Sequence, residues 1–193
     1  IMQLSPIYDL NLERMFTLLR FALLKATIAG EIDEGGLPFS AALALQCFTN
    51  EYVFAENDEE IKALEFLKSK MAVDLEIGKQ VPSSHIATLG AYIPLHKFAQ
   101  AQNICEHKWC RDIEEVIVRQ ILEPREELTL RSQIPELTSI GNKISHSVRE
   151  QFEENRWPLW VKTGLHKNSK TIKEDLEGSP LNFRLDDYVS PER

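Results

Sequence analysis

The chain has 193 residues, of which 43% are hydrophobic, and a formal net charge of −8. A chain of this size can bury a sizeable core as one globular domain, or as one domain with an extension. The charge is uneven, because the first 60 residues hold ten acidic and only three basic side chains. A chain without a basic stripe lacks the positive surface that attracts phosphate backbones, so we expect no nucleic-acid partner.

The most apolar stretch, residues 18–28, is interrupted by Arg20 and Lys25. It is shorter than the roughly 20 apolar residues that cross a bilayer. It therefore predicts a buried helix and no membrane partner. We see no secretory signal, and the three cysteines are an odd number, which favours free thiols and a cytoplasmic location. Because the sequence starts with Ile1, we expect a fragment or a processed chain.

The first predicted element is an amphipathic helix that stops at Gly30. The segment "EIDEGGLPF" then predicts a hinge, so that residues 1–36 form an N-terminal helix and hinge. The helix is predicted from apolar residues at helical spacing, namely Leu12, Met15, Phe16, Leu19 and Leu23.

A helical core domain is predicted for residues 37–160. The stretch from Phe39 to Phe54 is apolar on most sides and alanine-rich, which favours a buried helix. Asn57 and Glu60 have the spacing of a capping box for the next helix. The apolar face of that helix would consist of Ile61, Leu64, Leu67 and Met71.

The middle of this core domain predicts shorter helices. Ser83 or Ser84 would cap one that carries Ile86 and Leu89, and Pro94 would restart the chain for another. Residues 111–123 form a further amphipathic helix, which we expect Pro124 to interrupt before helical character resumes. Its stripe consists of Ile113, Val116, Ile117 and Ile121.

The last helix of the core domain would end near Asn155, with Ile144, Val148 and Phe152 on one face. Residues 161–193 are more polar and predict a linker or arm leading toward a further domain. Within this arm, Thr171 and Glu174 are spaced as a capping box, and residues 181–185 alternate between apolar and polar. The predicted fold class is mainly α, a multi-helix bundle-like domain with an extended C-terminal arm.

"CEHKWC" brings Cys105, His107 and Cys110 together, with His96 upstream. Thiolates and imidazole are good zinc ligands, and a small zinc-dependent domain is one reading. A structural zinc ion normally needs four protein ligands, however, and only three are clustered. We therefore expect buried thiols at a helix–loop–helix junction and no metal.

Other patterns of catalytic chemistry are weak. Ser145 and His146 are adjacent on a predicted helix, so their side chains diverge, and no serine has a nucleophile-elbow glycine pattern. The carboxylates of "NDEE" and "PREE" fall where helices are expected to start, a position that acids favour. No glycine-rich phosphate loop is present, so we predict no catalytic residue and no cofactor in this segment.

The stretch "FEENRWPLW" ends the predicted core domain with two of the three tryptophans around a proline. Large rigid aromatics can clamp an extended tail onto a helical body, or can be presented to a partner. We favour the clamp, because most large aromatics are buried. The predicted interaction or interdomain residues are Phe152, Glu153, Glu154, Asn155, Trp157, Pro158 and Trp160.

The stretch "IPELTSIGNKISHSVREQFEENRWPLW" resembles a junction in bacterial tetratricopeptide-repeat proteins that carry a class I S-adenosylmethionine-dependent methyltransferase domain. Trp157 stands where that family usually has Tyr, and Arg156 where it often has Pro. The resemblance extends over about residues 37–193. The matching residues are Leu137, Thr138, Ile140, Glu153, Glu154, Asn155, Pro158 and Trp160.

The resemblance implies a methyltransferase parent that uses S-adenosylmethionine, but it carries no catalytic or cofactor residue over to this segment. The repeats and the catalytic domain of such a protein would lie outside residues 1–193. The expected function is a non-catalytic helical module that positions or recruits a protein substrate, with adjacent domains of the same chain as further partners. The alternative is a stand-alone module that docks a partner protein on its aromatic patch.

Overall fold

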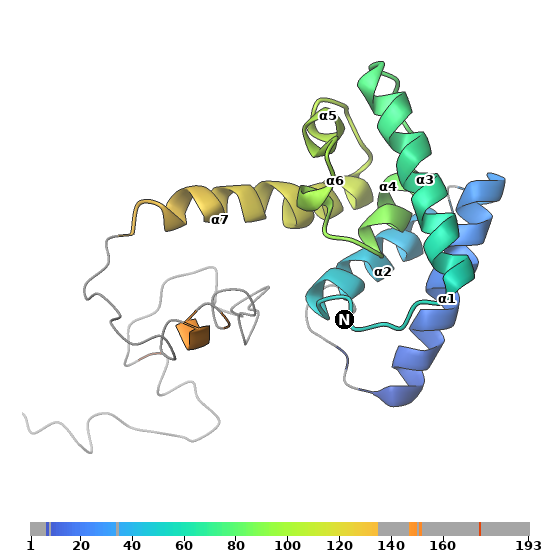
Figure 1. Ribbon diagram of the computed structural model, residues 1–193, viewed down its shortest axis with the longest axis horizontal. Coiled ribbons are helices and arrows are strands. Elements are labelled where there is room, and N and C mark those ends of the chain that lie inside the picture. Colours follow the sequence, from blue (N-terminus) through green and yellow to red (C-terminus); the bar gives the residue numbers. More distant parts are fainter. Residues whose placement is uncertain are drawn as a thin grey trace, which may run out of the picture. The chain divides into compact units, whose positions relative to one another are not determined.

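The computed structural model describes Ile7 and residues 9–33, 35–134, 147–149, 151 and 174. The chain divides into the units Ile1–Leu159 and Trp160–Arg193, and Glu174 is the one described residue of the second. Within the described residues all regular structure is helical, as predicted (Figure 1). None of these helices is both long and apolar enough to span a bilayer. The domain boundaries predicted at residues 36 and 160 stay predictions.

Helix α1 (Leu10–Ala29) begins at Asp9, whose carboxylate accepts from the N–H groups of Asn11 and Leu12. It ends at Gly30, which has a left-handed φ of 75° that favours glycine. Its buried face differs from the predicted one, because Leu12 and Met15 are exposed. The four buried residues are Phe16, Arg20, Leu24 and Thr27.

Helix α2 (Leu37–Thr49) is buried on most sides, as predicted. The prediction that it continues to Phe54 was wrong, because the chain leaves the helix after Thr49. Glu51 and Tyr52 both take left-handed conformations, with φ of 54° and 57°. This turn positions the Tyr52 hydroxyl 3.2 Å from the carbonyl oxygen of Gly90. The tertiary contact helps to hold two residues in a conformation that non-glycine residues rarely adopt.

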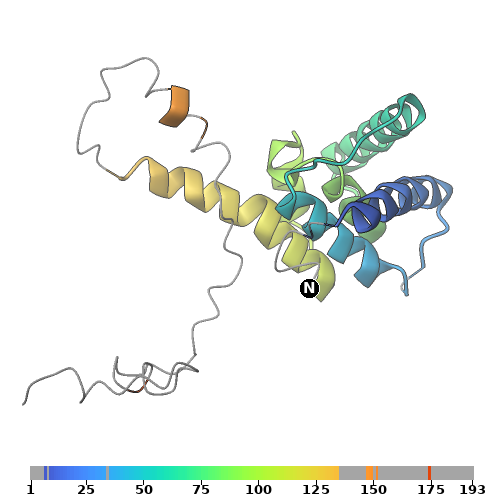
Figure 2. The same ribbon diagram turned by 90° about the horizontal axis from the view of Figure 1, so that it is seen from below.

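Helix α3 (Asp58–Glu76) starts with the predicted capping box, in which Asn57 accepts from the Glu60 N–H and Glu60 accepts from the Asn57 N–H. Helix α4 (Ser83–Gly90) follows, and its cap prediction was wrong. Pro82 precedes the helix, and neither serine makes a side-chain cap. The last six residues of α4 are buried, because this helix packs against α1, α2, α3 and α6 (Arg111–Ile117) at the centre of the helical body (Figures 1 and 2).

A 3₁₀ turn (Leu95–Lys97) and α5 (Ala101–Cys105) lead to α6. The predicted apolar stripe of α6 is buried, but the predicted break at Pro124 was wrong. The helix continues through a π-helical turn, η2 (Val118–Leu122), into α7 (Glu123–Arg131). Proline lacks the N–H that would bond the carbonyl of Gln120, and His96 Nδ1 lies 3.2 Å from that oxygen instead. The partner lost at Pro124 is thus replaced by a side chain.

Continuity of the helix also changes the reading of the "PREE" carboxylates. They follow a helical turn directly and do not stand at a free helix start. The "NDEE" carboxylates do start a helix, since Asp58, Glu59 and Glu60 form the first turn of α3. Negative charge there is stabilised by the unpaired N–H groups of the helix terminus.

Candidate functional site: a buried arginine network

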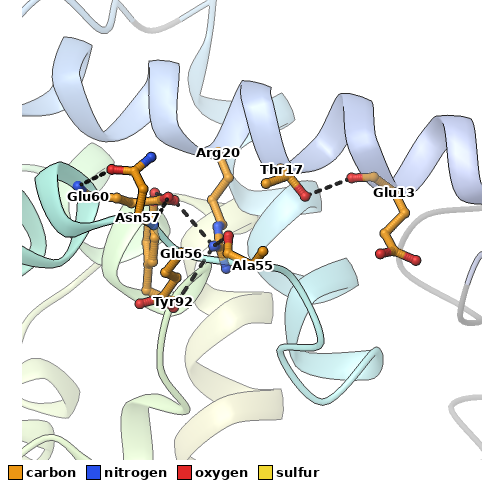
Figure 3. A network of polar contacts seen from close by, with 8 residues as sticks. All are labelled: Glu13, Thr17, Arg20, Ala55, Glu56, Asn57, Glu60 and Tyr92. Carbon is orange, nitrogen blue, oxygen red and sulfur yellow. Dashed lines mark hydrogen bonds and ion pairs between the residues drawn. The ribbon is translucent and has the colours of Figure 1, made fainter.

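Among the described residues, the largest concentration of buried charge surrounds Arg20, whose side chain points from the middle of α1 toward the start of α3 (Figure 3). Arg20 Nη2 donates to Glu60 Oε1 at 3.2 Å and to the Ala55 carbonyl oxygen at 3.1 Å. Glu56, at the edge of the cluster, lies 3.9 Å from the same nitrogen. Arg20 and Glu60 are each 1% exposed, so water contributes little to the solvation of either charge.

Tyr92 completes this cluster from the turn after α4. Its hydroxyl donates a short hydrogen bond of 2.5 Å to Glu60 Oε1. Its ring centroid lies 4.2 Å from the Arg20 guanidinium carbon, and the Phe54 centroid lies 5.5 Å from it. Aromatic faces attract a cation, which offsets part of the cost of its burial. We call Arg20, Glu60, Tyr92 and their contacts the Arg20 network.

The hydrogen bonds of the Arg20 network and the raised pKa of Tyr92 argue against acid–base chemistry at this cluster. Burial, and secondarily the hydrogen bond to Glu60, raise the pKa of Tyr92 well above its usual range. The phenol is therefore held as a donor at neutral pH. Both oxygens of Glu60 are also occupied, one by Arg20 and Tyr92 and the other by the Asn57 N–H. A carboxylate so saturated is poorly placed to accept a proton from a substrate.

Two nitrogens of Arg20, Nε and Nη1, are buried without a hydrogen-bond partner. Across the described residues, His85 Nδ1 is the one other buried side-chain atom in this condition. The nearby aromatic rings give the guanidinium weak compensation at best, because N–H···π contacts are second-order interactions. Arg20 thus depends strongly on the partners that it does have.

A second polar cluster, the Gln120 network, is neutral and joins α2, α4 and the π turn. Gln120 Nε2 donates to the carbonyl oxygens of Ala44 at 3.1 Å and Gly90 at 3.0 Å. Its Oε1 accepts from the Leu95 N–H at 3.3 Å, and the Tyr52 hydroxyl lies 3.4 Å from it. The π turn directs this fully buried amide into the core, where both ends of the amide are satisfied.

The approach at Gly90 is close. A Cβ atom at this position would lie 3.1 Å from Gln120 Oε1 and 3.4 Å from its Nε2. Glycine therefore allows α4 and the π turn to come together around the amide. Beside this contact, Arg119 Nη2 donates to Thr49 Oγ1 at 3.2 Å, a further link from the π turn to the end of α2.

The described cysteines show no arrangement for metal binding or nucleophilic catalysis. Cys105 ends α5 and Cys110 precedes α6, with the Trp109 indole between them donating to the Ile104 carbonyl at 2.8 Å. The prediction that both cysteines of this junction are buried was wrong, because Cys105 is half-buried and Cys110 is exposed. No three His, Cys, Asp or Glu side chains of the described residues gather closely enough to hold a metal ion. Cys47 is buried, which raises the pKa of its thiol to about 12 despite the charge of Arg20. Such a thiol is a poor nucleophile.

All of the predicted interaction residues, Phe152 to Asn155, Trp157, Pro158 and Trp160, lie outside the described residues, as do Ser145 and His146. Of the helix predicted to carry Ile144, Val148 and Phe152, the structure describes residues 147–149 and 151. These are helical, and Val148 is 46% exposed. The aromatic clamp and the extended arm therefore stay predictions.

Sequence reasoning missed the two residues around which the polar networks form. We had interpreted Arg20 as a break in an apolar run, yet it lies four residues after Phe16 and four before Leu24. That spacing places its side chain on the buried face, and this was the available signal. Gln120 carries the same signal, because it lies four residues after Val116 and three after Ile117 in the predicted stripe.

Comparisons of the chain with models of protein families, with curated proteins and with solved structures gave no match.

Proposed function

We propose that the helical body is a non-catalytic protein-interaction module that positions a partner protein or an adjacent domain. The polar side chains of the Arg20 and Gln120 networks are buried, and within each network they are used in hydrogen bonds that hold the helices together. They therefore connect helices and have little capacity left for a substrate. A protein with this arrangement acts through its surface.

The observation that carries this proposal is α7, a helix without a single buried side chain. Arg125 Nη1 donates to Gln102 Oε1 at 2.8 Å, and both groups are exposed. Leu128 and Leu130 are exposed on the same helix. Helices in proteins gain most of their stability from packing, so a helix of this kind gains from a neighbour on its surface.

The resemblance of residues 137–160 supports a narrower form of the proposal. In it, the module belongs to a longer protein with an S-adenosylmethionine-dependent methyltransferase domain, and the positioned partner is the protein substrate. The reading frame that follows Arg193 distinguishes this form from a stand-alone module. A glycine-rich strand–loop there supports the narrower form, and an immediate stop codon rejects it.

Site-specific photocrosslinking tests the interaction role of α7. A photoreactive amino acid is placed at Leu128 or Leu130 in cells that produce the chain, and at exposed Leu18 on α1 as the control. We expect a discrete protein adduct from the α7 positions alone. The adduct partner, once purified, should bind the chain at least about tenfold more weakly after Leu130→Asp, a loss of about 1.4 kcal/mol. Equal adducts at all three positions, or unchanged affinity, contradict the proposal.

A titration with S-adenosylmethionine tests the non-catalytic part. We expect no saturable heat from the 193-residue chain, because a backbone that approaches the cofactor closely needs a glycine-rich loop, and the sequence has no such loop. Saturable micromolar binding contradicts this expectation.

A further inference from the structure

A second surface, on the outer side of α3, carries an exposed apolar stripe that is independent of α7. Phe66, Val73 and Ile77 are 57%, 60% and 72% exposed, respectively. Phe66 and Val73 are seven residues apart on one face of α3, away from the buried face that includes Leu67 and Met71. Ile77 follows Val73 by four residues and caps the end of the helix, so it extends the same stripe. Figures 1 and 2 both show α3 at the edge of the helical body.

Two charged residues accompany this stripe. Lys70 lies between Phe66 and Val73 and makes no hydrogen bond or ion pair with another described residue. Asp74 lies at the boundary between this face and the buried face, where its side chain is 16% exposed, and it accepts from Lys79 through Oδ1 at 3.0 Å. A carboxylate can accept several hydrogen bonds, so Asp74 can also pair with a second cation.

The stripe on α3 can pair with the same stripe on a second, antiparallel copy of α3. The midpoint of Phe66 and Ile77 falls between residues 71 and 72, and the midpoint of Lys70 and Asp74 falls at residue 72. An antiparallel copy of α3, related by a two-fold axis at this point, would oppose Phe66 to Ile77 and Lys70 to Asp74. Because the two-fold axis repeats each pair, two apolar contacts and two ion pairs would form together.

We propose that α3 forms an antiparallel homodimer contact with α3 of a second copy of this chain, centred on residues 71–72. Val73 lies next to the axis and closes the apolar layer between the two Phe66–Ile77 pairs. A lysine at this seam contributes its apolar stem to the contact while its ammonium group reaches the opposing carboxylate. The single helix pair is small compared with obligate interfaces, so the association is weak and reversible.

Sedimentation velocity over about 1 to 100 µM tests this contact, a range suited to weak association. We expect the wild-type chain to shift from monomer toward dimer as concentration rises. Phe66→Ser should remove the shift, whereas Leu18→Ser on α1 should retain it. Thermal unfolding of each variant verifies that the fold is intact.

Charge reversal tests the register. Lys70→Glu places a carboxylate opposite Asp74 and should abolish dimerisation, whereas Lys70→Glu with Asp74→Lys reverses both ion pairs and should restore it. Lys68→Glu, a reversal on the same helix away from the stripe, should leave dimerisation unchanged. A wild-type chain that stays monomeric throughout overturns the proposal, as does a dimer that persists in both Phe66→Ser and Lys70→Glu. Neither result affects the role proposed for α7.

Discussion

The Arg20 network and the Gln120 network both join helices through buried polar groups, but they differ in charge and in completeness. The Arg20 network holds an ion pair and leaves two guanidinium nitrogens without partners. In the Gln120 network a neutral amide has a partner at each end. The ion pair therefore makes each partner costly to remove, whereas the amide connects three segments without a buried charge.

The difference follows from solvation. Removing one member of a buried ion pair leaves a charge that neither water nor protein stabilises, which is strongly unfavourable. Removing a neutral amide leaves backbone groups unsatisfied, at a smaller cost for each group. The contrast predicts a ranking of effects on stability, from the charged network to the neutral one and then to the packing around it.

Arg20→Ala should cause the largest loss, about 3–5 kcal/mol, because the carboxylate of Glu60 stays buried without its cation. For a chain of this size that corresponds to a fall of roughly 6–20 °C in melting temperature. Arg14→Ala, on the exposed side of the same helix, is the matched control and should change stability by no more than about 0.5 kcal/mol. Similar melting temperatures for the two variants would contradict the account.

Gln120→Leu should cost less, about 2–3 kcal/mol, because the Leu95 N–H and the Ala44 carbonyl lose the bonds that the amide makes to them. The Gly90 carbonyl also loses the amide but keeps the Tyr52 hydroxyl. The apolar replacement has a similar volume, so the loss reports mainly on hydrogen bonding. Gln133→Leu, in the exposed turn after α7, controls for the chemical change. Urea unfolding measures both, and a loss at Gln120 no larger than at Gln133 would show that the amide is dispensable.

Gly90→Ala tests the packing around the Gln120 amide without removing any hydrogen-bonding group. The added methyl group would press on the Gln120 amide, and overpacking of this kind typically costs about 1–3 kcal/mol. Part of this should be recovered by the shorter amide in Gly90→Ala/Gln120→Asn. Urea unfolding measures both variants. If Gly90→Ala is as stable as the wild-type chain, the amide moves aside freely and the close approach is not a constraint.

The smallest expected effect concerns pH. Burial, together with the charges of Lys70 and Lys79, lowers the pKa of His85 from 6.5, although Asp74 opposes the shift. The unfolded chain therefore binds a proton near pH 6.5, while the folded chain binds it only at lower pH. The free energy of unfolding should fall as pH drops below about 6.5.

His96 should add to this fall, because burial also lowers its pKa. Urea unfolding between about pH 7.5 and 5.5 measures the trend. His85→Gln should flatten it, whereas His107→Gln, at the α5–α6 junction, controls for loss of an imidazole. An equal slope in wild type and His85→Gln would exclude His85 as the cause.

Local patterns were enough to predict much of the fold. The capping box of Asn57 and Glu60 depends on residues three apart, and the α6 stripe depends on helical periodicity, so both are visible in the sequence. Pro124 was misread because the partner that replaces its missing N–H is His96, 28 residues earlier. The end of α2 was misread for a similar reason, since Tyr52 is held by Gly90.

The polar networks could be predicted only in part. Helical spacing places Arg20 on a buried face, but its partners Glu60 and Tyr92 are 40 and 72 residues away. Local sequence carries no information on which carboxylate meets a buried cation. The two roles of Glu60 were also hidden, because the capping box alone accounts for a glutamate at this position.

A double-mutant cycle on Arg20 and Glu60 tests most directly whether the Arg20 network is a structural connection whose two charges act as a pair. Arg20→Met, Glu60→Gln and the double variant are compared with the wild-type chain by urea unfolding. We predict a coupling free energy of about 1–3 kcal/mol between the two side chains. The double variant should be at least as stable as the less stable of the two single variants. Losses that add to within about 0.5 kcal/mol would show two independent residues and would contradict the account.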